Sequence, residues 1–457
     1  MLLGLDLGTT NIKALVTDFG GHRLGEGVRP IERYDGEGGK VEQDIEEIWQ
    51  AALEAMDMAV RDMDPAGIKA IGVSSQGGAM QLLDARRRPA GRVISWLDRR
   101  GQPFDRELTK ELGQEWFAKR IGHRHSGLAM GQLLRLRREQ SAQLARPNRI
   151  GFVGDIIVSR LCGRPAHDGT SGGLTLLYNP ALRDYEPELL SRLEITPDQL
   201  PELLPPNQPA GGLLPGIASR IGLRKGIPVS AAIHDQYCGA LAAGTVRPGT
   251  VMVGTGTTWI LLVVSDHPAP PATADALTCH HLIDGAWGQI VSLTNGGPAL
   301  AQALEATCQD ARSALEIDDL MESAPAGQLD LQPGHVLRSA VEGLAFELKR
   351  QICHLRQSKL PMEKAVLSGR AAASRVIPQI LSTVTGLPIA RAGQGGGSPL
   401  GAAIIARGLL EPGISLGDLA AAMAPAAQET SPEHAAGLHH EPFGQYLRSL
   451  QARAFAQ

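Results

Sequence analysis

The chain has 457 residues, of which 43% are apolar, so we expect two to three domains with a core in each. Its formal net charge is −4, and its densest basic stretches, residues 86–88 and 135–138, are short and typical of solvated surface. This balance excludes a nucleic-acid backbone from the expected partners.

The cysteines and the apolar segments indicate the cellular compartment in which the protein is expected. The cysteines have no CxxC spacing and are odd in number, which favours reduced thiols: Cys162, Cys238, Cys279, Cys308 and Cys353. The first residues lack a basic segment and lead at once to Asp6, so they predict a strand rather than a signal peptide. The longest apolar run, residues 251–264, is broken by glycines and threonines and is too short to cross a bilayer. We therefore expect a soluble cytoplasmic protein without membrane contact.

The chain begins with the pattern of a β-hairpin. Residues 2–7 and 12–18 favour strands, and the Gly-Thr-Thr-Asn sequence at 8–11 supplies turn chemistry. Asp6 stands inside the first apolar strand, where a carboxylate beside small residues and hydroxyls fits a holder of Mg²⁺ near nucleotide phosphates. The alternative is a turn aspartate that caps its own hairpin, and the neighbouring residues favour the functional interpretation.

The following segments indicate an α/β fold. Apolar residues return at helical spacing over 45–63, and residues 68–74 predict a buried strand. Strand, helix and strand in this order are typical of α/β proteins.

Polar and amphipathic residues gather where strands are expected to end. Gln76 follows one strand, and Trp96, Asp98 and Arg99 lie together further along. Hydrogen-bonding groups with one stacking ring suit a polyhydroxylated molecule. A surface ion pair within Asp98-Arg99-Arg100 explains that segment equally well.

The next candidate is an acid at the start of a helix. Residues 201–215 predict a surface loop, and residues 229–233 predict a strand. Asp235 follows that strand and opens a run of small residues, where α/β proteins place reactive groups. It is a candidate general base for a substrate hydroxyl or a helix N-cap, and the two roles are compatible. Gln236 beside it would bind a substrate hydroxyl or solvent.

Residues 251–264 repeat the opening pattern. Strands at 251–253 and 259–264 flank a Gly/Thr turn at 254–258. Two such hairpins facing each other across a cleft would clamp the phosphate chain of one nucleotide.

The remaining segments include one motif that we reject as a metal site. Cys279, His280 and His281 are adjacent, so their side chains alternate in direction, and no second ligand pair stands at finger spacing. Later elements are expected at 339–355, 376–384, 443–455 and from 400 onward (helices), 365–367 (strand), 393–397 (glycine-rich loop) and 425–440 (loose connection).

Collinear motifs along nearly the whole chain resemble the FGGY carbohydrate kinases of the actin-like ATPase superfamily. The segments that carry the resemblance include GLDLGTTNIKALVTD, KVEQDIEEIW, IGVSSQGGAMQLLD, ISWLDRR, GIPVSAAIHDQYCGALAAG, VMVGTGTTWIL, LSGRAAASRVIPQILSTVTGLPI and GSPLGAAIIARGL. The resemblance implies an α/β fold of two ribonuclease-H-like domains with a cleft between them, ATP bound there, and phosphoryl transfer to a sugar or polyol hydroxyl. It implies a sugar-binding domain with the catalytic base over 1–243 and a nucleotide-binding domain over 244–457.

The same resemblance implies roles for individual residues. Asp235 matches the catalytic base, and Asp6 the carboxylate linked to Mg²⁺. The residues implied to bind ATP are Asp6, Gly8, Thr9, Thr10 and Lys13 at the first hairpin, Gly254, Thr255, Gly256 and Thr257 at the second, and Ser368, Gly369, Arg370 and Gly397 near adenine and ribose. The residues implied to contact the sugar are Gln76, Gly77, Trp96, Asp98, Arg99, Asp235 and Gln236.

The chain departs from the family pattern in three places. Gln132 and Arg135 stand where Lys and Trp are common. The adenine segment opens with Ser368 instead of glycine, and the Met-His that often follows Gln76 is missing. These changes affect the expected geometry of bound ATP, which is the phosphate donor, and the expected identity of the substrate.

We therefore expect a kinase that transfers the γ-phosphate of ATP to a small ketose or polyol, with xylulose as the leading substrate. Glycerol- or erythritol-type polyols, sedoheptulose and deoxy-sugars are the alternatives. A non-catalytic nucleotide-dependent sensor is the alternative from another class, and a chaperone-type ATPase is disfavoured because no peptide-binding domain follows. The sequence leaves a homodimer open.

Overall fold

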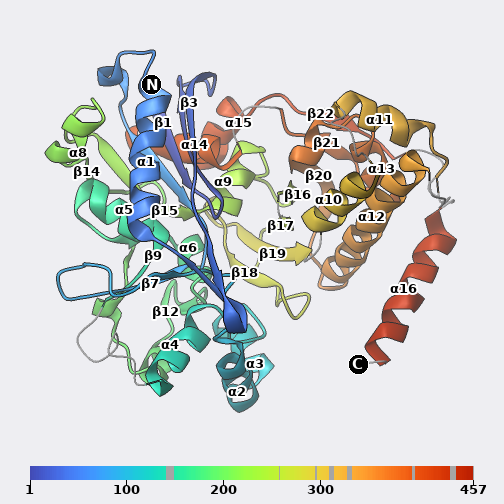
Figure 1. Ribbon diagram of the computed structural model, residues 1–457, viewed down its shortest axis with the longest axis horizontal. Coiled ribbons are helices and arrows are strands. Elements are labelled where there is room, and N and C mark those ends of the chain that lie inside the picture. Colours follow the sequence, from blue (N-terminus) through green and yellow to red (C-terminus); the bar gives the residue numbers. More distant parts are fainter. Residues whose placement is uncertain are drawn as a thin grey trace. The chain divides into compact units, whose positions relative to one another are not determined.

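The computed structural model describes residues 1–139, 149–256, 258–293, 296–307, 313–326, 332–393, 397–432 and 439–455 (Figure 1). The chain folds into two compact units. The first comprises Met1–Val246, Asp266–Gln289 and Gly395–Ala424, and the second comprises Arg247–Ser265, Ile290–Gln394 and Pro425–Gln457. Both units are therefore discontinuous in sequence. The predicted division of roles between 1–243 and 244–457 stays a prediction.

The first unit is built on an eight-stranded sheet in the order β13-β10-β15-β6-β1-β2-β3, with β14 paired to β15. Its strands are β1 (Leu2–Leu7), β2 (Asn11–Thr17), β3 (Arg23–Pro30), β6 (Ile71–Ser75), β10 (Ala166–His167), β13 (Glu202–Leu203), β14 (Pro209–Gly212) and β15 (Pro228–His234). β1 is antiparallel to β2 and parallel to β6, which is parallel to β15. The polar residues after β6 and β15 thus lie at the same edge of the sheet.

A smaller sheet in the first unit has the order β4-β5-β8-β7-β9. Its strands are β4 (Tyr34–Gly36), β5 (Lys40–Gln43), β7 (Met80–Leu83), β8 (Val93–Ile94) and β9 (Arg149–Phe152), and β11 (Tyr178–Asn179) pairs with β12 (Asp184–Tyr185). The helices of this unit are α1 (Ile45–Val60), α2 (Gln102–Leu112), α3 (Gln114–Arg120), α4 (Ala129–Arg138), α5 (Val153–Cys162), α6 (Gly169–Gly173), α7 (Pro187–Arg192), α8 (Pro215–Arg220), α9 (Asp235–Ala242), α14 (Gly397–Leu410) and α15 (Leu416–Met423).

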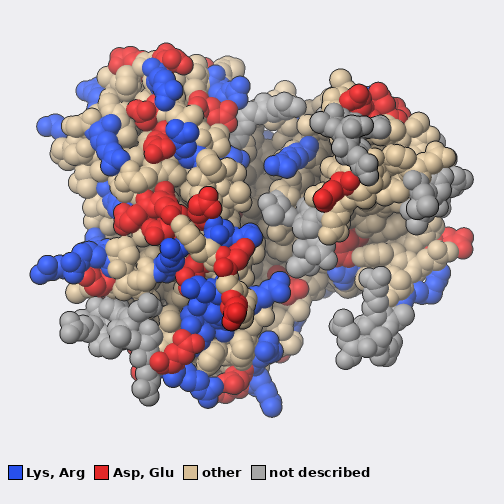
Figure 2. Space-filling view, in the orientation of Figure 1, with Lys and Arg blue, Asp and Glu red and all other residues tan. Residues whose placement is uncertain are grey.

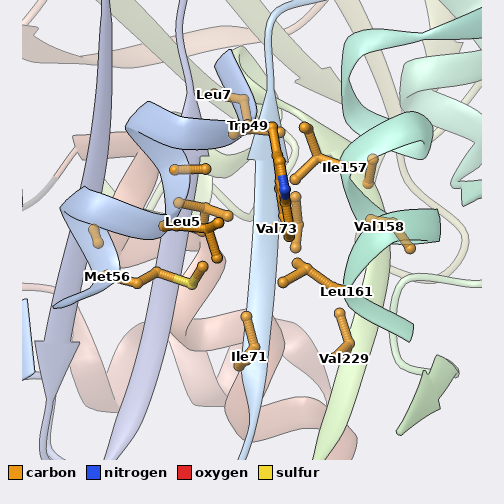
Figure 3. Packing of buried hydrophobic residues seen from close by; sticks show 14 of the residues in the cluster. Leu5, Leu7, Trp49, Met56, Ile71, Val73, Ile157, Val158, Leu161 and Val229 are labelled. Carbon is orange, nitrogen blue, oxygen red and sulfur yellow. The ribbon is translucent and has the colours of Figure 1, made fainter. Parts of the chain in front are cut away.

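Strand alternation separates the two faces of the main sheet. Leu3, Leu5 and Leu7 of β1 are fully buried in one hydrophobic cluster with residues of α1 and α5. Figure 3 shows side chains of α1 and α5 meeting Val73 of β6 and Val229 of β15 in this cluster. Full burial of one leucine or valine stabilises a fold by about 1.5–3 kcal/mol. Because successive side chains of a strand point to opposite faces of the sheet, Gly4 and Asp6, which lie between the leucines, point to the opposite face.

Helix α14 covers that opposite face at very short range. A Cβ atom on Gly4 would lie 1.9 Å from the carbonyl oxygen of Pro399, and one on Gly72 would lie 1.8 Å from that of Ala402. Only glycine lets the helix backbone come this close to β1 and β6. Asp6 and the start of α9 lie on the face that α14 covers.

The prediction of a loop over residues 201–215 is wrong in part, because β13 and β14 lie within it. β14 has the sequence Pro-Ala-Gly-Gly and pairs with β15 through its backbone at the side of the sheet. Such a strand has no alternation of apolar side chains, so its sequence carries no strand signal.

The second unit repeats the strand arrangement of the first. Five adjacent strands of a seven-stranded sheet follow the order β17-β16-β20-β21-β22, with β16 (Gly249–Thr255), β17 (Trp259–Ser265), β20 (Met362–Gly369), β21 (Ile389–Arg391) and β22 (Gln428–Thr430). β16 is antiparallel to β17 and parallel to β20, which is parallel to β21. This is the pattern of β1, β2, β6 and β15, so the repeat seen in the sequence extends to the topology.

The remaining elements of the chain are β18 (Leu277–His280), β19 (Trp287–Leu293), α10 (Gly296–Thr307), α11 (Ala314–Ser323), α12 (Pro333–Gln357), α13 (Ile377–Thr385) and α16 (His440–Phe455). Short 3₁₀ turns lie at Glu37–Gly39, Pro65–Gly67, Pro197–Gln199 and Arg370–Ala373. On the face shown in Figure 2, acidic and basic side chains are interspersed over the first unit. Among the residues that the structure describes, no helix combines the length and the apolar character needed to span a membrane.

Candidate active site

Asp6 is a buried carboxylate in the middle of the main sheet. Its Oδ1 accepts a hydrogen bond of 2.8 Å from the Ser74 hydroxyl of the neighbouring strand β6. Burial, and then the nearby Asp235 carboxylate, raise the pKa of Asp6 to about 6, against the smaller effects of Ser74 and Lys13. Asp6 as a whole residue is 7% exposed, so the charge it carries near neutral pH is poorly solvated. A carboxylate in this environment suits a cation.

The β1–β2 turn is fixed by a closed set of hydrogen bonds. The Trp96 indole N–H donates to the Thr9 hydroxyl at 3.0 Å, and that hydroxyl donates to Gln76 Oε1 at 3.1 Å. Gln76 Nε2 donates to Gln43 Oε1 at 3.0 Å, and Gln43 Nε2 donates to the Thr9 carbonyl at 3.0 Å. The structure thus brings together one predicted ATP-binding residue, Thr9, and two predicted sugar-binding residues, Gln76 and Trp96.

Gly77 follows Gln76 at a position where no side chain fits. A Cβ atom there would lie 2.7 Å from Leu174 Cβ and 2.9 Å from Cδ2 of the His234 ring. The space that a longer residue would need at position 77 is therefore filled by Leu174 and His234.

Asp98 and Arg100 form an ion pair, which was the alternative to sugar binding in the sequence analysis. Arg100 Nη2 lies 2.7 Å from Asp98 Oδ2, and Val41 N–H donates to the same oxygen at 2.9 Å. Although burial acts in the opposite direction, the hydrogen bonds from Arg100 and Val41 lower the pKa of Asp98. Gln132, where the family commonly has Lys, donates to Asp98 Oδ1 at 3.1 Å. These contacts favour a structural role for Asp98, and its contact with a sugar stays a prediction.

Arg99 differs from its two neighbours. Its side chain is exposed, while its backbone N–H donates to the Gly39 carbonyl at 2.9 Å. An exposed side chain can reach a bound substrate, and the role of Arg99 in substrate binding stays a prediction.

Asp235 opens α9 directly after β15, as predicted. Gln236 Nε2 donates to its Oδ1 at 3.2 Å, and His234 Nε2 lies 3.2 Å from the same oxygen. Burial raises the pKa of Asp235 to about 6, against the hydrogen bonds from Gln236. Asp235 keeps 23% of its side chain exposed, so the carboxylate is both desolvated and reachable. A carboxylate with this pKa is a better proton acceptor than an ordinary aspartate.

His234 is a neighbour of the base that the sequence analysis did not single out. It is buried, and burial lowers its pKa to about 3, so the imidazole is neutral. Its Nδ1 atom is buried without a hydrogen-bond partner among the described residues. The Ser398 hydroxyl of α14 donates to the Asp235 backbone carbonyl at 3.0 Å and so ties α14 to the start of α9.

In the second unit, β16 and β20 bring two predicted nucleotide segments together. Gly254 pairs in register with Ser368, and Thr255 with Gly369. The Thr255 hydroxyl donates to the Ser368 carbonyl at 2.6 Å and accepts from the Ala371 N–H at 3.1 Å. Thr255 is therefore a link between the segments, while Gly256, Gly369 and Arg370 are exposed.

Other predicted residues fall into three groups. Thr10 and Lys13 are exposed beside the β1–β2 turn, and Gly8 is half-buried. Gly397 begins α14 and belongs to the first unit, whereas the segment at Ser368 belongs to the second. Thr257, Cys308 and residues 394–396 lie outside the described residues.

The residues around Cys279 make contacts within the first unit. The Cys279 thiol donates to the Gly169 carbonyl at 3.3 Å, and His281 Nδ1 accepts from the Ile283 N–H at 3.3 Å. Tyr178 OH lies 3.3 Å from His280 Nδ1. These contacts hold residues 279–281 against neighbouring residues of the first unit, which is typical of a structural segment.

Gln43, Ser74 and His234 are site residues that sequence reasoning missed. Ser74 interrupts an apolar strand as Asp6 does, and that shared irregularity is a usable signal. Gln43 ends a strand just before Asp44, which caps α1, and nothing in that local pattern indicates a contact with Thr9. In the sequence, only the position of His234 beside Asp235 distinguishes it from a histidine with a structural role.

Two family models match the chain. The N-terminal domain model of the FGGY family of carbohydrate kinases matches residues 1–242, and the C-terminal domain model matches residues 310–407. A glycerol kinase of Alkalilimnicola ehrlichii is 27% identical over 455 residues and covers 89% of each chain. The xylulose kinase of Escherichia coli K12 is 24% identical over 457 residues and covers 92% of each chain.

Solved structures show the same fold. The crystal structure of a xyloylose kinase from Brucella ovis has a TM-score of 0.90 with 22% identity and covers 100% of both chains. The predicted fold class, α/β with two ribonuclease-H-like domains of the actin-like ATPase type, is confirmed. The chain therefore belongs to the FGGY family of carbohydrate kinases and is an ATP-dependent carbohydrate kinase.

Proposed function

We propose that this kinase phosphorylates a hydroxyl of a small ketose, with xylulose as the leading candidate, and that Asp235 is the general base. The observation that carries the base assignment is a desolvated, reachable carboxylate with a pKa of about 6 at the start of α9. Gln236 and His234 both face its Oδ1. We therefore assign Oδ2 to the substrate proton.

In this mechanism the substrate oxygen attacks the γ-phosphorus while its proton passes to Asp235 Oδ2. The bond between the γ-phosphorus and the bridging oxygen breaks, and ADP leaves with that electron pair. Positioning and electrostatic stabilisation supply most of the acceleration in phosphoryl transfer. The exposed Thr10 and Lys13 beside the β1–β2 turn are the first-unit groups proposed to meet the phosphates.

We infer that Asp6 holds Mg²⁺, directly or through water. Asp6 is buried, and its pKa is raised by burial and by Asp235, so a divalent cation would offset unfavourable negative charge there. When bound, the cation supplies positive charge that neutralises the transferred phosphoryl group.

For the sugar, we propose contacts from Trp96 and Gln76. The Trp96 N–H is bonded to Thr9 while the side chain is 37% exposed, so the ring offers its face rather than its polar edge. Gln76 presents its Oε1 to Thr9, and the second lone pair of that oxygen is suited to a sugar hydroxyl. A polyol such as glycerol is the second candidate, because relatives named glycerol kinase have similar identity to the chain.

The test is an ADP-release assay with Mg²⁺-ATP and a panel of pentuloses, hexuloses, sedoheptulose, glycerol and erythritol. We expect turnover with a ketose, and Asp235→Asn should lower kcat by about 10²–10⁴-fold while ADP binding is kept. Asp105→Asn is the matched control, since burial also raises the pKa of Asp105 to about 6 but it bonds Ser126 instead. Near-normal turnover of Asp235→Asn contradicts the base assignment, and silence across the whole panel favours the sensor alternative.

A further inference from the structure

Gln43 is a fully buried side chain that links the two sheets of the first unit at the site. It is the last residue of β5 in the smaller sheet, and it pairs in register with Val93 of β8. The chain continues from β8 to Trp96. Gln43 and Trp96 therefore approach the β1–β2 turn from the smaller sheet, whereas Gln76 follows β6 of the main sheet.

The direction of every hydrogen bond in this set follows from one carbonyl group. The Thr9 carbonyl only accepts, so the Gln43 group beside it must be the amide nitrogen, which leaves Gln43 Oε1 facing Gln76. Gln76 must then present Nε2 to Gln43 and Oε1 to Thr9. The Thr9 hydroxyl consequently donates to Gln76 and accepts from the Trp96 N–H, which is a donor only.

Only one set of proton positions is therefore consistent with all of these hydrogen bonds, which join Gln43, Gln76 and Trp96 to the β1–β2 turn. The Thr9 hydroxyl proton is used within the set, so Thr9 connects residues rather than donating that proton to a phosphate. Gln76 is held with its carbonyl oxygen toward Thr9, which is the orientation that a sugar hydroxyl would meet. Gln43 contributes to both consequences with its two hydrogen bonds of 3.0 Å, whereas the only other contact that favours this orientation of Gln76 among the described residues is the longer one of 3.5 Å from its Nε2 to the Gly8 carbonyl.

We propose that Gln43 is a positioning residue, which fixes the amide orientation of Gln76 and the shape of the β1–β2 turn and so couples the acceptor site to the phosphate turn. This inference rests on the proposed function for its kinetic consequences. Its structural part, the rigidity of the turn, is independent of any turnover.

The kinetic test uses Gln43→Met, which keeps the length of the side chain and removes both of its hydrogen bonds. We expect kcat/KM for the acceptor to fall about 10- to 100-fold, mainly through a higher KM, while ADP affinity without acceptor changes less than about threefold. Gln43→Glu should not rescue activity, because a carboxylate cannot donate to the Thr9 carbonyl. Gln81→Met is the matched control, since Gln81 is also fully buried in the first unit and also makes two hydrogen bonds, to the carbonyl oxygens of Leu82 and Gly91.

A double-mutant cycle separates positioning from general destabilisation. Thr9→Val removes the hydroxyl at constant shape, and combining it with Gln43→Met should cost less than the product of the two single losses. Losses that multiply, or a Gln43→Met effect no larger than that of Gln81→Met, would overturn the proposal.

Hydrogen exchange tests the turn without activity. Amides of residues 8–11 should exchange at least about tenfold faster in Gln43→Met than in the wild type or in Gln81→Met. Unchanged exchange overturns the proposal even if the enzyme turns over. Faster exchange in a protein that phosphorylates no acceptor instead supports the structural link and contradicts the proposed function.

Discussion

The carboxyl groups of Asp6 and Asp235 determine the expected pH dependence of the reaction. Burial raises the pKa of each to about 6, and the Asp235 charge adds to the effect on Asp6. The titratable groups near Asp235 include Asp6 on β1, the neutral His234 on β15 and the buried Cys238 on α9. We expect kcat/KM to fall as pH drops through about 6, because the base becomes protonated, and to level off above about pH 7. A profile that stays flat down to about pH 4.5 would contradict the assignment of Asp235.

The same shift makes Asp6 costly for stability. Its pKa is higher in the folded than in the unfolded chain, so its favourable contribution is present at low pH and is lost as pH rises through about 6. Asp6→Asn should therefore stabilise the protein by about 1–3 kcal/mol near neutral pH while abolishing turnover. Urea unfolding at about pH 7.5 and pH 4.5 measures the gain, which should shrink at the lower pH.

Asp98→Asn provides the opposite control for that measurement. Although burial acts in the opposite direction, the contacts with Arg100 and Val41 lower the pKa of Asp98. Its charge therefore stabilises the fold fully above the unfolded pKa, and this stabilisation is lost as pH falls through the folded pKa. Its replacement should destabilise the protein near neutral pH. Destabilisation by both variants would show that other contacts compensate the Asp6 charge in the folded protein, and it would contradict this prediction.

At the scale of elements, the close packing of α14 on the main sheet depends on Gly72. A Cβ atom at this position would lie 1.8 Å from a helix carbonyl, so Gly72→Ala must push α14 away from β6. We expect a loss of about 1–3 kcal/mol in the free energy of unfolding. Gly216→Ala in α8 is the matched control, because no atom lies within 4 Å of a Cβ there, and it should be neutral or slightly stabilising. Equal effects of the two substitutions in urea unfolding would contradict this account of the packing.

Activity should respond to the same substitution, because the start of α14 is bonded to the start of α9. The Ser398 hydroxyl reaches the backbone of Asp235, so a displaced α14 would shift the base. We expect kcat of Gly72→Ala to fall at temperatures where the protein is still folded.

In the whole molecule, the first unit is completed by two distant parts of the chain, Asp266–Gln289 and Gly395–Ala424. Residues 1–246 form most of it, but α14, from the segment Gly395–Ala424, packs on β1, β6 and α9. A fragment of residues 1–246 should therefore lack a cooperative unfolding transition in urea. Adding peptides of residues 266–289 and 395–424 together should restore one, with a midpoint that rises with the concentration of the 395–424 peptide. A fragment that unfolds cooperatively by itself would show that α14 is dispensable.

Features that depend on local pattern could be predicted from the order of the amino acids. The two hairpins, α1, β6, β15, α13 and the position of Asp235 at the start of α9 all follow from periodicity, turn residues and strand ends, and collinear motifs identified the family. These features are encoded by residues close together in the chain. Asp6 was found because an acid inside an apolar strand is unusual in any context.

Features that depend on partners far apart in the chain could not be predicted in this way. The link from Gln43 to Thr9 joins two sheets, the ion pair of Asp98 is completed by Val41 and Gln132, and β14 is a strand only because β15 supplies its partner. The membership of α14 in the first unit follows from backbone approaches at Gly4 and Gly72. Hydrogen bonds and close contacts between residues far apart in sequence leave no periodicity, and so only the folded chain reveals them.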